Sequence, residues 1–287
     1  MDFGLSTHLF HAEALGPGHL AAMAAEGFTA VEVFATRSHF DYHEIQAGRD
    51  LAGWCAASGV RLHSMHAPIT EFLHGTTWGP PFSTASSQAA QRARTVDECL
   101  KTLDLATVVP YAYLVLHLGV PDEYAPPSGD NQRDAVLRTL DVLMPAAERV
   151  GVRVAVEVIP NALSTARQLV RLIEEEDLSG LGICLDVGHA RLQGDVVDAL
   201  ETVAGYLVTT HLHDNGGRKD DHLLPFDGVI DWPELLIAFQ KVGYDSTLMF
   251  ELAAAADGPL TTLRRAGAVR RRLESLLGDT TFPFGDD

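Results

Sequence analysis

Leu181-Gly-Ile-Cys-Leu-Asp186 is a short apolar run that ends on a carboxylate. Five more runs have this form, each strand-like and each ending on an imidazole or a carboxylate: Arg61-Leu-His-Ser-Met-His66, Tyr113-Leu-Val-Leu-His117, Arg153-Val-Ala-Val-Glu157, Leu207-Val-Thr-Thr-His211 and Thr247-Leu-Met-Phe-Glu251. A charge at the end of a buried strand is costly unless something binds it. The repetition therefore predicts that these strand ends meet at one metal centre, at the mouth of a barrel.

The runs belong to a regular alternation of strand-like and helical segments, eight of each. We expect strands near 2–6, 30–34, 61–66, 113–117, 153–158, 181–186, 207–213 and 247–251. Helices are expected near 17–26, 45–58, 86–106, 131–149, 164–176, 195–204, 232–242 and 259–277, several opened by cap-like residues such as Ser164, Asp195 and Asp231. Eight β/α units in sequence predict an α/β fold, a (β/α)₈ TIM barrel.

The expected barrel forms a single domain over residues 1–278, followed by a flexible tail at 279–287. Two segments rich in Pro, Gly and Ser, 74–87 and 119–130, follow the third and fourth strands. Loops at that end of a TIM barrel carry the active site. We therefore expect both segments to border the site.

Side-chain alternation along a strand predicts which residues face the barrel axis. On the third strand, His66 shares a face with Ser64, whereas His63 has the opposite parity. We therefore expect His66 in the site and His63 packed toward the helices. By the same alternation, the residues that close the other runs converge at the carboxyl end of the barrel.

Composition limits the classes of function. The 287 residues are 46% hydrophobic, which supports a large core, and the formal net charge of −18 argues against a nucleic-acid partner held through its phosphates. Three separated cysteines suggest neither a disulfide framework nor a cysteine zinc site, so a reducing cytoplasm is expected. The sequence shows no secretory signal and no membrane span, and it leaves open whether the chain forms a homo-oligomer.

Four of the strand-end residues come from strands five to eight, which are neighbours around half the barrel: Glu157, Asp186, His211 and Glu251. Three carboxylates and one imidazole suit Mn²⁺, Mg²⁺, Co²⁺ or Zn²⁺. Any one of them alone could be a solvated loop residue or a satisfied core group. Four at equivalent strand ends favour a metal site.

Five further residues extend this ligand set. His66 and His117 close strands three and four, His189 follows Asp186 by three residues, and Asp220 and His222 share one side of an extended segment. A helix cap at His189 or a surface ion pair at Asp220 would be the simpler explanations. Occurring together, these residues favour additional metal ions or contacts to substrate hydroxyls.

Four residues are candidates for substrate binding: His189, Arg218, Glu32 and His8. Arg218 lies in a Gly-Gly-Arg-Lys turn that could grip a phosphate or carboxylate. Glu32 ends the second strand and could equally form a structural salt bridge. His8 and His213 could line the mouth, although a histidine near a rim is more often an ordinary hydrogen-bonding residue.

Three motifs resemble those of the xylose-isomerase-like TIM-barrel superfamily: Leu-Asp186-Val-Gly-His189-Ala, His211-Leu-His-Asp-Asn215 and Asp-His222-Leu-Leu-Pro-Phe-Asp-Gly228-Val-Ile-Asp231-Trp. That superfamily joins sugar and sugar-phosphate isomerases and epimerases to AP endonucleases of the endonuclease IV type. In the isomerase and epimerase branch, the resemblance implies one divalent ion held by the four residues of strands five to eight. It also implies acid and base roles for the two glutamates.

In the endonuclease branch, the resemblance implies three zinc ions held by all nine residues, with Glu157 bridging two of them. The sequence satisfies both patterns. It departs from the superfamily at Pro225-Phe-Asp227-Gly228, where Gly-Glu-Gly is more common, which puts loop contacts in doubt and leaves the metal ligands in place.

We expect a cytoplasmic, divalent-metal-dependent isomerase or epimerase of a small carbohydrate: a sugar, keto-sugar, cyclitol or sugar-phosphate. Glu157 and Glu251 would move a proton on either face of a carbon through a metal-stabilised enediolate. The first alternative is a zinc phosphodiesterase of the endonuclease IV type with two or three ions, which the acidic composition disfavours. The second is a barrel that binds metal or sugar without turnover.

Overall fold

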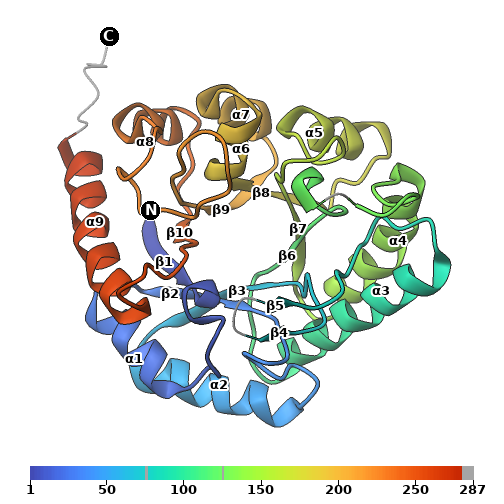
Figure 1. The fold of residues 1–287 in the computed structure, drawn as a ribbon, viewed down its shortest axis with the longest axis horizontal. Helices are drawn as coiled ribbons and strands as arrows, with labels where there is room; N and C mark the ends of the chain where they lie inside the picture. The colour runs from blue at the N-terminus through green and yellow to red at the C-terminus, as the bar shows by residue number, and fades with distance from the viewer. Residues whose placement is uncertain (75–76, 125, 280–287) are drawn as a thin grey trace.

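The computed structural model describes residues 1–74, 77–124 and 126–279. Eight parallel strands form a barrel that is enclosed by helices (Figure 1), which confirms the predicted TIM-barrel fold. In spatial order around the barrel the strands are β10 (Thr247–Phe250), β1 (Asp2–Ser6), β2 (Ala30–Phe34), β3 (Arg61–His66), β6 (Tyr113–Leu116), β7 (Arg153–Glu157), β8 (Gly182–Asp186) and β9 (Leu207–His211). The ring closes through the bridge between Leu212 and Phe250.

The helices that surround the barrel are α1 (Pro17–Ala25), α2 (Ile45–Ser58), α3 (Ala89–Asp104), α4 (Arg133–Arg149), α5 (Ala166–Glu175), α7 (Val196–Val203), α8 (Trp232–Lys241) and α9 (Pro259–Asp279). Asp195 and Asp231 cap α7 and α8 through their side chains, as predicted. Thr165, rather than Ser164, caps α5. Because α9 reaches Asp279, only residues 280–287 of the predicted tail lie outside the described residues.

Short elements lie in the loops that follow the strands, except the 3-10 helix η2 (Leu105–Thr107), which extends the end of α3 ahead of β6. The others are the 3-10 helices η1 (Thr7–Phe10) and η3 (Asp122–Tyr124), the hairpin of β4 (Leu73–His74) and β5 (Thr77–Trp78), and the helix α6 (Val187–Gln193). The Asp186 side chain caps α6 by accepting a hydrogen bond from His189 N at 2.7 Å. Asp186 therefore ends a strand and starts a helix at the same point.

The predicted orientation of His63 is wrong, because β3 contains a bulge. In the β2–β3 register, Val31 pairs with Leu62 and Glu32 with Ser64, so His63 is an extra residue without a partner. A bulge shifts the alternation by one position. His63 consequently faces the barrel interior, where its Nε2 lies 3.0 Å from Thr209 Oγ1 on β9.

Beneath the strand ends, the barrel interior is filled by side chains. Val115, Ala155 and Cys184 form an apolar cluster with Tyr113 and Val208 that is separate from the main core. The main core lies between the strands and the helices. The carboxyl ends of the strands therefore lie above a layer of packed side chains. Among the described residues, no helix is both long enough and apolar enough to span a membrane.

Candidate functional site

Glu157, at the end of β7, lies at the centre of the predicted site. Its side chain is fully buried, and four imidazoles surround its two oxygens. Oε2 lies 3.2 Å from His66 Nε2 and 3.1 Å from His117 Nε2. Oε1 lies 3.2 Å from His211 Nδ1 and 3.4 Å from His189 Nδ1. The strand ends thus converge as the alternation predicts.

This environment keeps Glu157 ionised. Burial raises the pKa of its carboxyl, but the charges of His117 and His211 and the hydrogen bonds from His117 and His189 together lower it further, and the net pKa lies well below the usual range. The pKa of His211 is also shifted: burial lowers it, whereas Cys184, Glu251 and other acidic neighbours raise it well above the usual value. A buried anion among imidazoles requires cations, either protons or a metal ion.

Glu32, predicted to reach substrate, lies instead against His211. Its side chain is fully buried, its Oε1 is 3.0 Å from His211 Nε2, and its Oε2 accepts a hydrogen bond from Ser64 Oγ at 2.7 Å. Donation from His211 Nε2–H to Glu32 leaves Nδ1 directed at the other carboxylates, 3.2 Å from Glu157 Oε1 and 3.4 Å from Glu251 Oε2. Glu32 therefore fixes the imidazole in the orientation needed to bind a metal through Nδ1.

A second cluster, comprising His189, His213, Asp220 and His222, lies beside the first. Asp220 Oδ2 is 3.0 Å from His189 Nε2 and 3.1 Å from His222 Nε2. The other oxygen, Asp220 Oδ1, is buried and has no hydrogen-bond partner among the described residues. His222 has a φ of 46°, in the left-handed region that non-glycine residues seldom occupy. Such backbone strain is found mainly at functional sites.

Acidic neighbours favour the protonated form of both imidazoles that contact Asp220. Burial lowers the pKa of His222, but Asp220 raises it by charge and hydrogen bonding, to about 9. Burial likewise lowers the pKa of His189, and Asp186 and Asp220 raise it well above the usual value. These protons occupy positions where a metal ion would replace them.

His213 was expected only at the rim, yet it belongs to this cluster. Its Nε2 lies 2.9 Å from Asp186 Oδ1, and its ring stacks on that of His222 with centroids 4.0 Å apart. A Cβ at position 188 would come within 2.0 Å of this ring, so Gly188 makes room for it. Side-chain alternation was the sequence signal that could have placed His213 in the site, because His213 lies two residues after His211 and therefore points to the same side.

The residues present fit divalent metal ions. Three groups have ligand atoms that all lie within 4.8 Å of one another: His66, His117 and Glu157; Glu157, Asp186, His211 and Glu251; and His189, His213, Asp220 and His222. All nine predicted ligands occur in these groups. Buried imidazoles and carboxylates, together with the unpaired Asp220 oxygen, form a donor set for Zn²⁺, Mn²⁺ or Co²⁺.

The groups border a cavity of about 460 Å³, a volume suited to a small molecule. His8, His189 and Glu251 reach its wall, as does His11, which sequence reasoning missed. Both Pro/Gly/Ser-rich segments contribute to the lining, as expected. Arg218 is exposed and is not among the residues that line the cavity.

A buried carboxylate shapes the loop that carries Asp220 and His222. Asp214 accepts hydrogen bonds from Val229 N at 2.9 Å and from Trp232 Nε1 at 2.7 Å. A Cβ at Gly228 would lie 2.2 Å from Asp214 Oδ1, so this position requires glycine. The loop that departs from the superfamily pattern therefore keeps an anchored backbone.

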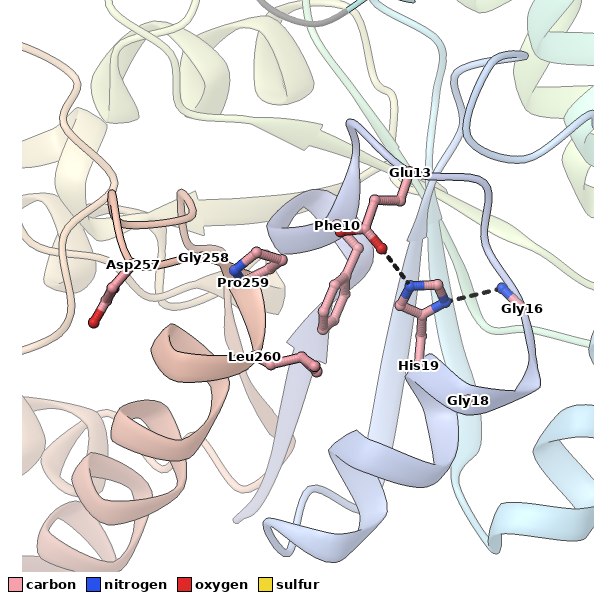
Figure 2. Close-up of a pocket in the computed structure, with 9 residues that line it drawn as sticks. All are labelled: Phe10, Glu13, Gly16, Gly18, His19, Asp257, Gly258, Pro259 and Leu260. Atoms are coloured by element: carbon pink, nitrogen blue, oxygen red, sulfur yellow. Dashed lines mark hydrogen bonds and ion pairs between the residues drawn. The ribbon is translucent and has the colours of Figure 1, made fainter.

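Figure 2 shows a second hollow, of about 530 Å³, between the loop that follows η1 and the start of α9. Phe10 and Leu260 form its apolar wall, and His19 contacts both Glu13 and the backbone of Gly16. Asp257 lies on the far side from His19 (Figure 2). None of the groups with metal-ligating geometry among the described residues reaches this hollow, so we place the functional site at the histidine groups.

Comparison with known proteins agrees with the fold. The model of the xylose isomerase-like TIM barrel family matches residues 20–276. The uncharacterized protein y4fM of Sinorhizobium fredii is 31% identical over 242 residues, which cover 77% of this chain and 76% of that protein.

Two solved structures illustrate the shared fold. A D-tagatose 3-epimerase-like protein has a TM-score of 0.81 at 22% identity, covering 98% of this chain and 100% of that chain. The IolI protein with a zinc atom has a TM-score of 0.74 at 16% identity, covering 99% of this chain and 100% of that chain. The family match and the y4fM relative place the chain by sequence as well as by fold: it belongs to the xylose isomerase-like TIM barrel family.

Proposed function

We propose that the protein is a divalent-metal-dependent isomerase or epimerase acting on a small carbohydrate, that is, a sugar, keto-sugar, cyclitol or sugar-phosphate. One observation carries the proposal. The buried group of Glu157, Asp186, His211 and Glu251 lies at the carboxyl end of the barrel and meets the cavity through Glu251. The likeness to a D-tagatose 3-epimerase-like protein and to zinc-containing IolI supports this choice.

The two glutamates occupy different positions relative to the cavity. Glu251 is part of the cavity wall, whereas Glu157 is fully buried and held by four imidazoles. When bound, a divalent ion would supply Lewis-acid polarisation of a substrate carbonyl. In the proposed mechanism, Glu251 takes a proton from the adjacent carbon, and Glu157 returns one to the other face. His189 and His8 orient substrate oxygens from the wall.

A second candidate function is a zinc phosphodiesterase with more than one ion. The arrangement that favours it is the shared position of Glu157, which belongs to two of the three ligand groups. Neighbouring ions that share a carboxylate would suit hydrolysis of a phosphodiester. Against it, no Lys or Arg occurs among the described residues that line the cavity, so a phosphate would be held there only by the imidazoles and ions of the ligand groups.

Proton exchange separates the two candidates. Metal-loaded protein incubated in deuterated water with a panel of ketoses and cyclitols should incorporate deuterium into at least one of them. Removal of metal with a chelator should abolish the incorporation, and readdition should restore it. Cleavage of an abasic-site duplex without any deuterium incorporation would favour the hydrolase.

A further inference from the structure

The cavity has two chemically different parts. The ligand groups supply imidazoles and carboxylates on one part of its lining. Most of the remainder is apolar or aromatic, including Phe34, Ile69, Trp78, Phe82, Val120 and Tyr124. Outside the histidines and acids, the polar groups of the described lining side chains are the Thr70 and Tyr124 hydroxyls and the Trp78 indole N–H.

Such a lining is a poor match for a free sugar and for a sugar-phosphate. A free sugar has hydroxyl groups on every side, and each one buried against an apolar wall loses its hydrogen bonds to water without replacement. A phosphate is commonly bound by Lys or Arg, and the described lining has neither. Among the described lining residues, the only charged side chains that a phosphate would face are the imidazoles and carboxylates of the ligand groups.

Two aromatic residues of the lining are left open to solvent. Trp78, on β5, is 45% exposed, and Tyr124, at the end of η3, is 64% exposed. The Trp78 ring faces that of His11, with centroids 6.0 Å apart. Exposed aromatic surface at the edge of a cavity contributes favourable binding free energy when a ligand covers it.

Building on the proposed function, we infer that the substrate is an uncharged carbohydrate or cyclitol that carries an apolar alkyl or aryl substituent. Its oxygen-rich edge faces the histidines and carboxylates. The substituent lies against Trp78, Tyr124 and the apolar side chains deeper in the cavity. This narrows the proposed substrates by excluding phosphate esters and by requiring an apolar portion.

Hydroxamic acids test this inference without knowledge of the sugar. Acetohydroxamic acid and benzohydroxamic acid have the same oxygen chelating group and differ in their apolar portion, and phosphoglycolohydroxamate adds a phosphate. By calorimetry on metal-loaded protein, benzohydroxamic acid should bind about tenfold or more tightly than acetohydroxamic acid, as expected for burial of an aromatic ring. Phosphoglycolohydroxamate should bind no more tightly than acetohydroxamic acid.

Variants of the apolar lining residues test whether the difference in affinity between the two hydroxamic acids arises from contacts with them. Trp78→Ala and Tyr124→Ala should each reduce the preference for the phenyl group at least threefold and leave acetohydroxamic acid affinity unchanged. Leu260→Ala, at a residue that is 53% exposed outside this cavity, is the matched control and should change neither affinity. Equal affinity for acetohydroxamic and benzohydroxamic acid, or tighter binding of phosphoglycolohydroxamate, would overturn this inference and leave the proposed function standing. Binding of acetohydroxamic acid that is no better with metal than without it would contradict the proposed function as well.

Discussion

At the scale of single residues, the contact between Glu32 and His211 fixes the orientation of a candidate metal ligand. Glu32 has no exposed surface, yet its carboxylate stays paired with an imidazole at 3.0 Å. Residues that orient a metal-binding histidine commonly change metal affinity 10–100-fold when they are replaced. The apolar run around Glu32 suggested a position at the end of the second strand, whereas Glu32 lies in the middle of β2, and the sequence could not show that its partner is a histidine of β9.

The first prediction concerns this pair. Glu32→Gln should weaken Zn²⁺ or Co²⁺ binding about tenfold, because the amide no longer supports His211 with a negative charge. Calorimetry with metal-free protein measures the affinity, and circular dichroism checks the fold. Glu44→Gln, at an exposed carboxylate, is the control and should bind metal like the wild type. Unchanged affinity in Glu32→Gln would show that the contact is structural only.

The second prediction concerns the proton-transferring glutamates. Glu157→Gln and Glu251→Gln should each lower turnover by more than tenfold, which corresponds to about 1.4 kcal/mol or more, because each removes a ligand charge and a proton carrier. The rate of deuterium incorporation measures this loss in metal-saturated protein. A variant that keeps over a tenth of the wild-type rate would remove that glutamate from the chemistry.

The third prediction follows from the pKa of His222, which is raised to about 9. A raised folded-state pKa stabilises the protein fully below the unfolded value of about 6.5, and this stabilisation is lost as the pH rises to about 9. The metal-free protein should therefore be roughly 1–3 kcal/mol less stable toward urea at pH 9 than at pH 6.5. His222→Gln should reduce that difference, whereas an undiminished difference would place the titration elsewhere.

At the scale of elements, alternation predicted the inward faces of β7, β8 and β10 but failed on β3. Glu157 and Ala155 both face inward, as do Asp186 and Cys184, because these strands place every second residue on the axis. On β3 a bulge adds His63 to the inward face. A bulge depends on pairing with the neighbouring strand, so a strand's own sequence does not reveal it.

The fourth prediction tests the interior position of His63. Its pKa is lowered to about 4, mainly by burial and by Arg61, so the imidazole is neutral at physiological pH. Nδ1 accepts a hydrogen bond from Arg61 at 2.9 Å, and Nε2–H donates to Thr209. His63→Leu should lower the free energy of unfolding by roughly 1–3 kcal/mol, because it leaves the buried Thr209 hydroxyl without this partner. Urea unfolding that matches the wild type would contradict this orientation.

The short elements in the loops were beyond sequence reasoning for a related cause. The β4–β5 hairpin has two residues in each strand, and α6 spans seven residues, so both are shorter than the roughly 4 residues of a strand or 10 of a helix over which a hydrophobic pattern is recognised. Pro, Gly and Ser residues nevertheless marked 74–87, which contains most of the hairpin, and 119–130 as loops beside the site. Sequence could locate these loops, while their conformation depends on tertiary contacts such as those of Asp186 and Asp214.

At the scale of the whole molecule, the barrel brings strand ends that are distant in the sequence together at one end of the barrel. The loops above them enclose a cavity of about 460 Å³. The nine predicted ligands come from strand ends, from α6 and from one loop, and all of them fall into the three groups. The number of ions that these groups hold does not follow from residue types. It depends on how protons and metal ions compete for the same imidazoles.

The measurement that tests the central claim most directly is the metal content of the double variant Asp220→Ala with His222→Ala, beside that of the wild type. An isomerase or epimerase with one essential ion at Glu157, Asp186, His211 and Glu251 should retain about one ion per chain in both proteins, with weaker substrate binding in the variant. Loss of about one ion per chain, together with loss of a phosphodiesterase activity that the wild type shows, would contradict the proposal and establish the hydrolytic cluster instead.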